Sequence, residues 1–67
     1  MKVIIRNPRR RELELRGKRR VGDILVELSL NPEVYIVIRG QELLTRDRVV
    51  DEDDTIEIVS AVSGGAR

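Results

Sequence analysis

The sequence contains no cysteine, histidine, tryptophan or phenylalanine, and Tyr35 is its only aromatic residue. Without cysteine there is no disulfide, thiolate nucleophile or iron–sulfur cluster, and a zinc ion would lack its two usual ligands. Without histidine there is no general base that titrates near neutral pH. These absences disfavour catalysis by side chains, and they fit a protein that binds a partner and carries out no catalysis itself.

Long apolar runs are also missing. Charged residues make up 37% of the chain and the mean hydropathy is −0.28, and no run approaches the roughly 20 apolar residues that a membrane helix needs. Arg6 interrupts the apolar stretch that ends at Ile5, which argues against a secretory signal peptide. A chain of 67 residues can form only one small domain. We therefore expect a soluble, cytoplasmic protein with no membrane partner.

Charges of opposite sign are separated along the chain. Residues 1–20 carry nine Lys and Arg against two Glu, whereas residues 21–67 carry four Arg against ten Asp and Glu. A basic hairpin that faces an acidic edge of the same fold explains this split without any partner. The alternative is a nucleic-acid-binding module that neutralises phosphates with Arg9–Arg11 and Lys18–Arg20. Because no aromatic residue lies in these segments to stack on bases, nucleic acid is not the partner we expect.

The spacing of apolar residues predicts three kinds of segment. Residues 2–6 predict a strand with Val3 and Ile5 on one face, and residues 12–16 alternate polar and apolar side chains. The Asn7-Pro8 turn between them predicts a hairpin. Apolar residues at i, i+3, i+4 and i+7 from Val21 predict a helix over about residues 21–30. The β-branched segments 34–38 and 55–59 predict two further strands, with a short strand at 42–44.

A hairpin, a helix that packs on one sheet face and later strands together predict an α+β fold. If the helix covers the face that alternation assigns to the core, eight side chains lie beneath it: Val3, Ile5, Leu13, Leu15, Ile36, Ile38, Ile56 and Ile58.

The same alternation leaves apolar side chains on the other face of the sheet. With Ile36 and Ile38 inward, Tyr35, Val37 and Val59 point outward. An exposed sheet face is normally polar, so these residues, together with Val62 in the following segment, are the predicted partner-binding surface. High β-propensity on an exposed face is the alternative explanation. The acidic run Asp51–Asp54 lacks the spacing and the glycine of a calcium loop, so we expect no metal site.

Four segments resemble one family of small proteins: Met1–Ile5, Val21–Leu25, Val37–Glu42 and Asp54–Gly65. Together they are similar to the β-grasp, or ubiquitin-like, fold of the ThiS/MoaD sulfur carriers. The most specific of them is a last strand that leads into Gly64-Gly65. The resemblance implies a mixed sheet of four to five strands with one helix on one face. It implies a domain over residues 1–60 and a flexible tail over residues 61–67.

The resemblance also implies a function for the tail. In this family the carboxylate of the terminal glycine is adenylated by a ubiquitin-activating-type adenylyltransferase that uses ATP, and it is then converted to a thiocarboxylate. By similarity the reacting residue is Gly65, preceded by Gly64, and it is exposed once Ala66 and Arg67 are removed. Glycines suit a narrow channel because they have no Cβ and accept any φ. The carrier itself binds no cofactor and is not an enzyme.

Further partners follow from the same resemblance. A sulfur donor loads the carrier, and an acceptor enzyme of the thiazole synthase or molybdopterin synthase type, or a tRNA thiolation pathway, takes the sulfur. A ubiquitin-like modifier that forms isopeptide bonds through Gly65 uses the same activation chemistry, so this alternative stays open.

Overall fold

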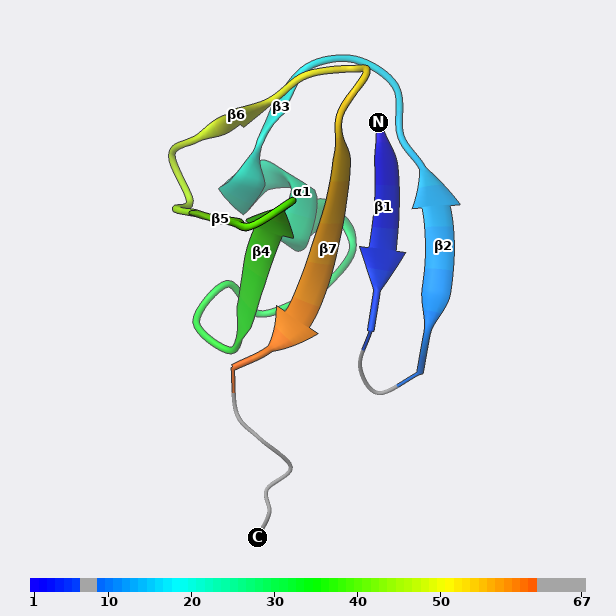
Figure 1. Ribbon diagram of the computed structural model, residues 1–67. Helices are drawn as coiled ribbons and strands as arrows, with labels where there is room; N and C mark the ends of the chain where they lie inside the picture. The colour runs from blue at the N-terminus through cyan, green and yellow to red at the C-terminus, as the bar shows by residue number, and fades with distance from the viewer. Residues whose placement is uncertain (7–8, 62–67) are drawn as a thin grey trace, which may run out of the picture.

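Five strands form one mixed sheet in the computed structural model, which describes residues 1–6 and 9–61. The strands are β1 (Lys2–Ile5), β2 (Arg11–Glu14), β4 (Tyr35–Arg39), β5 (Glu42–Leu44) and β7 (Thr55–Ser60). Their order in the sheet is β2-β1-β7-β4-β5, with β1 and β7 parallel and the other neighbours antiparallel (Figure 1). Because β1 and β7 are parallel, both strands end at the same end of the sheet.

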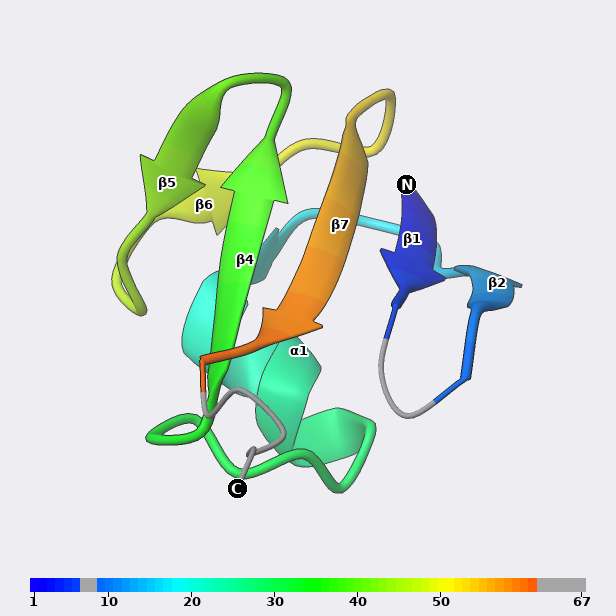
Figure 2. The same ribbon diagram turned by 60° about the horizontal axis from the view of Figure 1, so that its bottom comes forward.

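The helix α1 (Val21–Glu27) packs on one face of this sheet, as Figure 2 shows from below. Its buried residues are Val21, Ile24 and Leu25, which follow the predicted helical spacing. They meet buried side chains of the sheet and its connections: Met1, Val3, Ile5, Val37, Leu44, Val50, Ile56 and Ile58. The prediction of an α+β fold with one helix on a mixed sheet is confirmed. Within residues 1–6 and 9–61, α1 is far too short to cross a bilayer.

The helix ends earlier than the predicted boundary near residue 30. Ser29 has a φ of 61°, a left-handed conformation that stops helical propagation. The backbone N–H of Leu30 donates to the carbonyl of Leu25 (2.8 Å), and that of Ser29 donates to the carbonyl of Val26 (3.0 Å). These two bonds are the Schellman pattern of a helix C-terminus. The apolar periodicity continues to Leu28, so periodicity alone could not locate this end.

A second, two-stranded ladder joins the start of the helix to a later segment. β3 (Arg19–Arg20) pairs antiparallel with β6 (Val49–Val50), and Val50 is fully buried. The N–H groups of Val21 and Gly22 donate to the carbonyls of Arg48 and Arg46. These bonds engage N–H groups that a helix leaves without partners in its first turn.

The turn between β4 and β5 depends on one glycine. Arg39 pairs with Glu42, which leaves Gly40 and Gln41 as a two-residue loop, and Gly40 has a φ of 65°. A positive φ at the first loop position is typical of the primed hairpin turns, which favour glycine or asparagine there. We expect Gly40→Ala to lower the free energy of unfolding by about 1 kcal/mol. Gly40→Asn should lower the free energy of unfolding by less than Gly40→Ala does. Equal urea midpoints for Gly40→Ala and wild type would contradict the turn assignment.

Candidate functional site

The functional tail predicted from the sequence begins where β7 ends. The N–H of Ala61 donates to the carbonyl of Val34 (2.6 Å), and the N–H of Arg6 donates to the carbonyl of Ile58 (2.9 Å). We call Ser60 and Ala61 the tail root, because they are the last residues that the structure describes before Gly64 and Gly65. The predicted residues Val62, Gly64, Gly65, Ala66 and Arg67 lie outside the described part. The root is thus held against the start of β4, and β1 bonds to β7 two residues before it.

The predicted outward placement of Val37 and Tyr35 is wrong. Val37 is fully buried and Tyr35 packs against the core, whereas Ile36 and Ile38 are only half-buried. The reason is register: Val37 lies directly opposite Ile58 on β7. Residues directly opposite in an antiparallel pair share a face, so the buried Ile58 places Val37 under the helix. Alternation within 34–38 could not reveal this, because every residue there is apolar.

The open face of the sheet, opposite α1, therefore carries a different apolar set. Ile36 pairs with Val59, so the outward placement predicted for Val59 is correct. Ile38 pairs with Leu43, whose side chain is 58% exposed. We call the set Ile4, Ile36, Ile38, Leu43 and Val59 the open-face patch. Sequence reasoning missed four of its five members, since the signal that identifies them is the strand register.

One ion pair interrupts the open-face patch. Arg6 donates to Glu57 (3.1 Å), and Glu57 lies between Ile4 on β1 and Ile38 on β4 in the ladder. The pair separates Ile4 from the other four members, which form the continuous apolar part of the patch. An apolar centre with a polar rim is the usual composition of a protein–protein interface.

The acidic turn Asp51–Asp54 forms structural bonds. The carboxylate of Asp54 accepts the backbone N–H of Asp51 (2.9 Å) and a guanidinium N–H of Arg39 (2.9 Å). These bonds hold the pKa of Asp54 below its usual value, the Asp51 N–H contributing most. Arg39 also reaches Glu42 (3.4 Å), and its pKa is raised, chiefly by the hydrogen bond to Asp54. In the described residues no group of carboxylates is arranged to hold a metal ion.

The lowered pKa of Asp54 predicts a pH dependence of stability. A carboxyl whose pKa is lower in the folded than in the unfolded chain stabilises the fold above about pH 4. That stabilisation is lost as the pH falls through the folded pKa. Asp54→Asn should melt at a lower temperature than wild type at pH 7, and the gap should close in acid. Asp53→Asn, which alters an exposed carboxylate without an ion pair in the described structure, is the control, and an equal effect of both variants would contradict this role.

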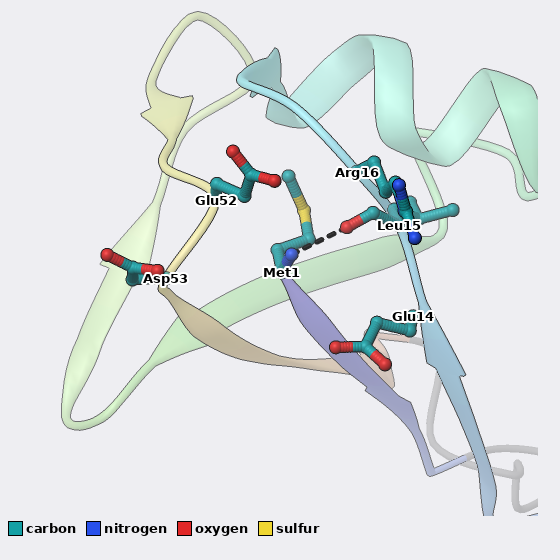
Figure 3. Close-up of a pocket in the computed structure, with 6 residues that line it drawn as sticks. All are labelled: Met1, Glu14, Leu15, Arg16, Glu52 and Asp53. Carbon is teal, nitrogen blue, oxygen red and sulfur yellow. Dashed lines mark hydrogen bonds between the residues drawn. The ribbon is translucent and has the colours of Figure 1, made fainter.

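A surface pocket lies at the other end of β1. Figure 3 shows it lined by Met1, Glu14, Leu15, Arg16, Glu52 and Asp53, with the amino group of Met1 donating to the carbonyl of Leu15 (2.6 Å). None of the residues predicted to be functional lines this pocket. The candidate site is therefore the tail root with the open-face patch.

Comparison with known proteins identifies the family of this chain. The model of the ThiS family matches residues 3–65, nearly the whole chain, and the match ends at Gly65. The chain belongs to the ThiS family. This ThiS-family chain is also 49% identical over 65 residues to the "Sulfur carrier protein TtuB" of Thermus thermophilus, covering 97% of this chain and 100% of that relative.

Family membership confirms two predictions made from the sequence. The mixed sheet with one helix is the ubiquitin-like β-grasp fold of ThiS proteins. The chain is a ThiS/MoaD-type sulfur carrier, that is, a small carrier rather than a catalyst. Carriers of this kind work with an adenylyltransferase and with sulfur-transfer enzymes.

Proposed function

We propose that this carrier acts through a thiocarboxylate on Gly65. The supporting observation is the family match, which includes the Gly64-Gly65 pair and stops before Ala66 and Arg67. After removal of these two residues, a carboxylate oxygen of Gly65 attacks the α-phosphorus of ATP and pyrophosphate leaves. A sulfur nucleophile at the oxidation level of sulfide then attacks the acyl carbon, AMP leaves, and the thiocarboxylate forms. An adenylyltransferase of the ubiquitin-activating type carries out the first step.

The described residues suit such a partner in two ways. Gly65 is the fourth residue after Ala61, so the reacting carbonyl lies at most about 14 Å beyond the tail root. An enzyme that holds Gly65 in its active site must therefore approach the end of β7 closely. The open-face patch offers an apolar surface on the strands next to that end, and Val59 lies in the patch directly before the root. We assign Val59 and Ile36 to this contact, together with Val62 from the predicted set.

The acceptor belongs to the pathways that use carriers of this shape: thiazole formation for thiamine, molybdopterin synthesis or tRNA thiolation. The acceptor enzyme for the first two is of the thiazole synthase or molybdopterin synthase type. The carrier itself holds no cofactor, because ATP binds to the activating partner. We place these reactions in the cytoplasm.

Intact mass spectrometry of the chain isolated from its own cells tests the proposal. The expected species ends at Gly65 and is heavier than the free acid by the difference between one sulfur and one oxygen atom. A ubiquitin-like modifier would instead be found joined through Gly65 to lysines of other proteins. A chain recovered only with Ala66 and Arg67 attached, and without sulfur, would contradict the proposal.

A further inference from the structure

An arginine-rich segment lies at the same end of the sheet as the tail root. The parallel pairing of β1 with β7 places Ile5 opposite Ile58, and the Arg6 N–H bonds to the Ile58 carbonyl (2.9 Å). The hairpin formed by β1 and β2 reverses at this end of the sheet, so Arg9, Arg10 and Arg11 lie there too. Figures 1 and 2 both show the end of β1 and the start of β2 at the same end of the sheet as the end of β7.

Two of these arginines have no partner within the described structure. Arg6 pairs with Glu57 and Arg10 pairs with Glu12, each at 3.1 Å. Arg9 and Arg11 are exposed, and neither side chain forms an ion pair or hydrogen bond in the described part of the chain. Glu33, next to the residue whose carbonyl accepts the Ala61 N–H, adds one exposed carboxylate nearby. Positive charge thus remains in excess at this end of the sheet.

We infer that Arg9 and Arg11 guide the tail root onto an acidic protein surface around the entrance of the channel that receives Gly65. This inference rests on the proposed function, because it concerns the enzyme that processes Gly65. The short reach from Ala61 to Gly65 keeps any such entrance within about 14 Å of the end of β7, the end of the sheet at which Arg9 and Arg11 also lie. Charges at the rim of an interface mainly raise the association rate and set the relative orientation of the partners.

A protein surface fits the observations better than a nucleic acid does. Single-stranded nucleic acid is bound by aromatic stacking together with basic residues. The only aromatic side chain of this protein, Tyr35, packs against the core and is not available for stacking on a base. In addition, the enzyme that takes Gly65 into its active site must contact the surface around the tail root, and this partner is a protein.

A matched pair of double variants tests the inference. The first, Arg9→Gln with Arg11→Gln, removes two charges at the tail-root end of the β1–β2 hairpin. The second, Arg20→Gln with Arg46→Gln, removes two exposed charges in β3 and in the segment between β5 and β6, away from the β1–β2 hairpin. Neither Arg20 nor Arg46 forms a side-chain ion pair in the described structure, so the two variants are alike in net charge and in lost bonds.

The measurement is stopped-flow association of each chain, ending at Gly65, with the ubiquitin-activating-type adenylyltransferase of the same organism, without ATP. At about 0.05 M salt we expect the first variant to associate roughly 5- to 10-fold more slowly than wild type, and the second within about twofold. At about 0.5 M salt the difference should disappear, because screening shortens the range of the charges. Circular dichroism should show both variants folded.

Four other outcomes of these measurements would overturn the inference. Equal slowing by both variants would show that net charge matters and location does not, which overturns the inference. No slowing by the first variant, while wild type still releases pyrophosphate with ATP, would overturn the inference and leave the proposed function intact. Loss of binding to total tRNA by the first variant, with unchanged enzyme association, would assign the arginines to RNA and also overturn it. If wild type neither binds the enzyme nor releases pyrophosphate, the proposed function fails and the inference fails with it.

Discussion

Val37→Asp is expected to abolish cooperative folding, whereas Val59→Asp should leave the fold in place. Val37 is fully buried opposite Ile58, with Leu44 on its other side, so the new carboxylate would have no partner and no water. Burying an unpaired ionised group costs several kcal/mol. A domain of this size is stable by roughly 3 to 10 kcal/mol in total. The substitution therefore removes most or all of the stability.

Val59→Asp is the matched control, since it introduces the same side chain on the neighbouring strand. Val59 lies on the open face opposite Ile36, where a carboxylate stays hydrated. Thermal melts by circular dichroism should show a cooperative transition for Val59→Asp and none for Val37→Asp. A native-like melt for Val37→Asp would contradict the register of β4 with β7.

Val59→Asp also tests the partner surface. Because it leaves the fold in place but adds a charge that must be desolvated in an interface, it should weaken binding to the adenylyltransferase about tenfold or more. Unchanged affinity would remove Val59 from the proposed contact.

The chain that ends at Gly65 is expected to release pyrophosphate when mixed with ATP and its adenylyltransferase, and the chain that ends at Arg67 is expected to release none. The reaction requires the carboxylate oxygen to approach the α-phosphorus to about 3 Å. Two extra residues move the carboxylate by up to about 7 Å, and no carboxylate then lies at the reacting position. The expected loss is complete until Ala66 and Arg67 are removed.

A substitution at Gly65 distinguishes the effect of the position of the carboxylate from the effect of side-chain size. Gly65→Val, in a chain that ends at residue 65, keeps the carboxylate in place but adds a β-branched side chain. A channel that accepts glycine because it lacks a Cβ should exclude this variant. Ser63→Ala, which keeps a small side chain in the same segment, should remain active. Pyrophosphate release by Gly65→Val at the wild-type rate would contradict the narrow channel, and release by the full-length chain would contradict the need for trimming.

How far the sequence predicts the fold differs from element to element. The change from a period of two to a period of 3.6 at Val21 predicted a helix, because burial of one helical face depends only on local spacing. A sheet of four to five strands was predicted from alternation and β-branched segments, and β5 was found at the predicted residues 42–44. The short β3–β6 ladder was not predicted, since two-residue strands have no periodicity to detect.

One part of the candidate site could be predicted from the sequence and the other could not. The Gly64-Gly65 motif after a final strand is a local feature, and together with the three other matching segments it suggested the family that residues 3–65 then matched. The open-face patch is not local. Residues 34–38 are apolar throughout, so both faces of β4 satisfy the sequence pattern, and only the pairing of Val37 with Ile58 decides which face the helix covers.

The sequence by itself therefore determined the helix, the strands of the main sheet and the glycine motif, because these depend on spacing and residue type along the chain. Only the tertiary structure decided that Val37 is core and Ile36 is surface, since strand register joins segments that are far apart in sequence. It also decided that Arg9 and Arg11 lie at the same end of the sheet as the tail root. This placement arises because β1 and β7, some fifty residues apart, pair in parallel and end together.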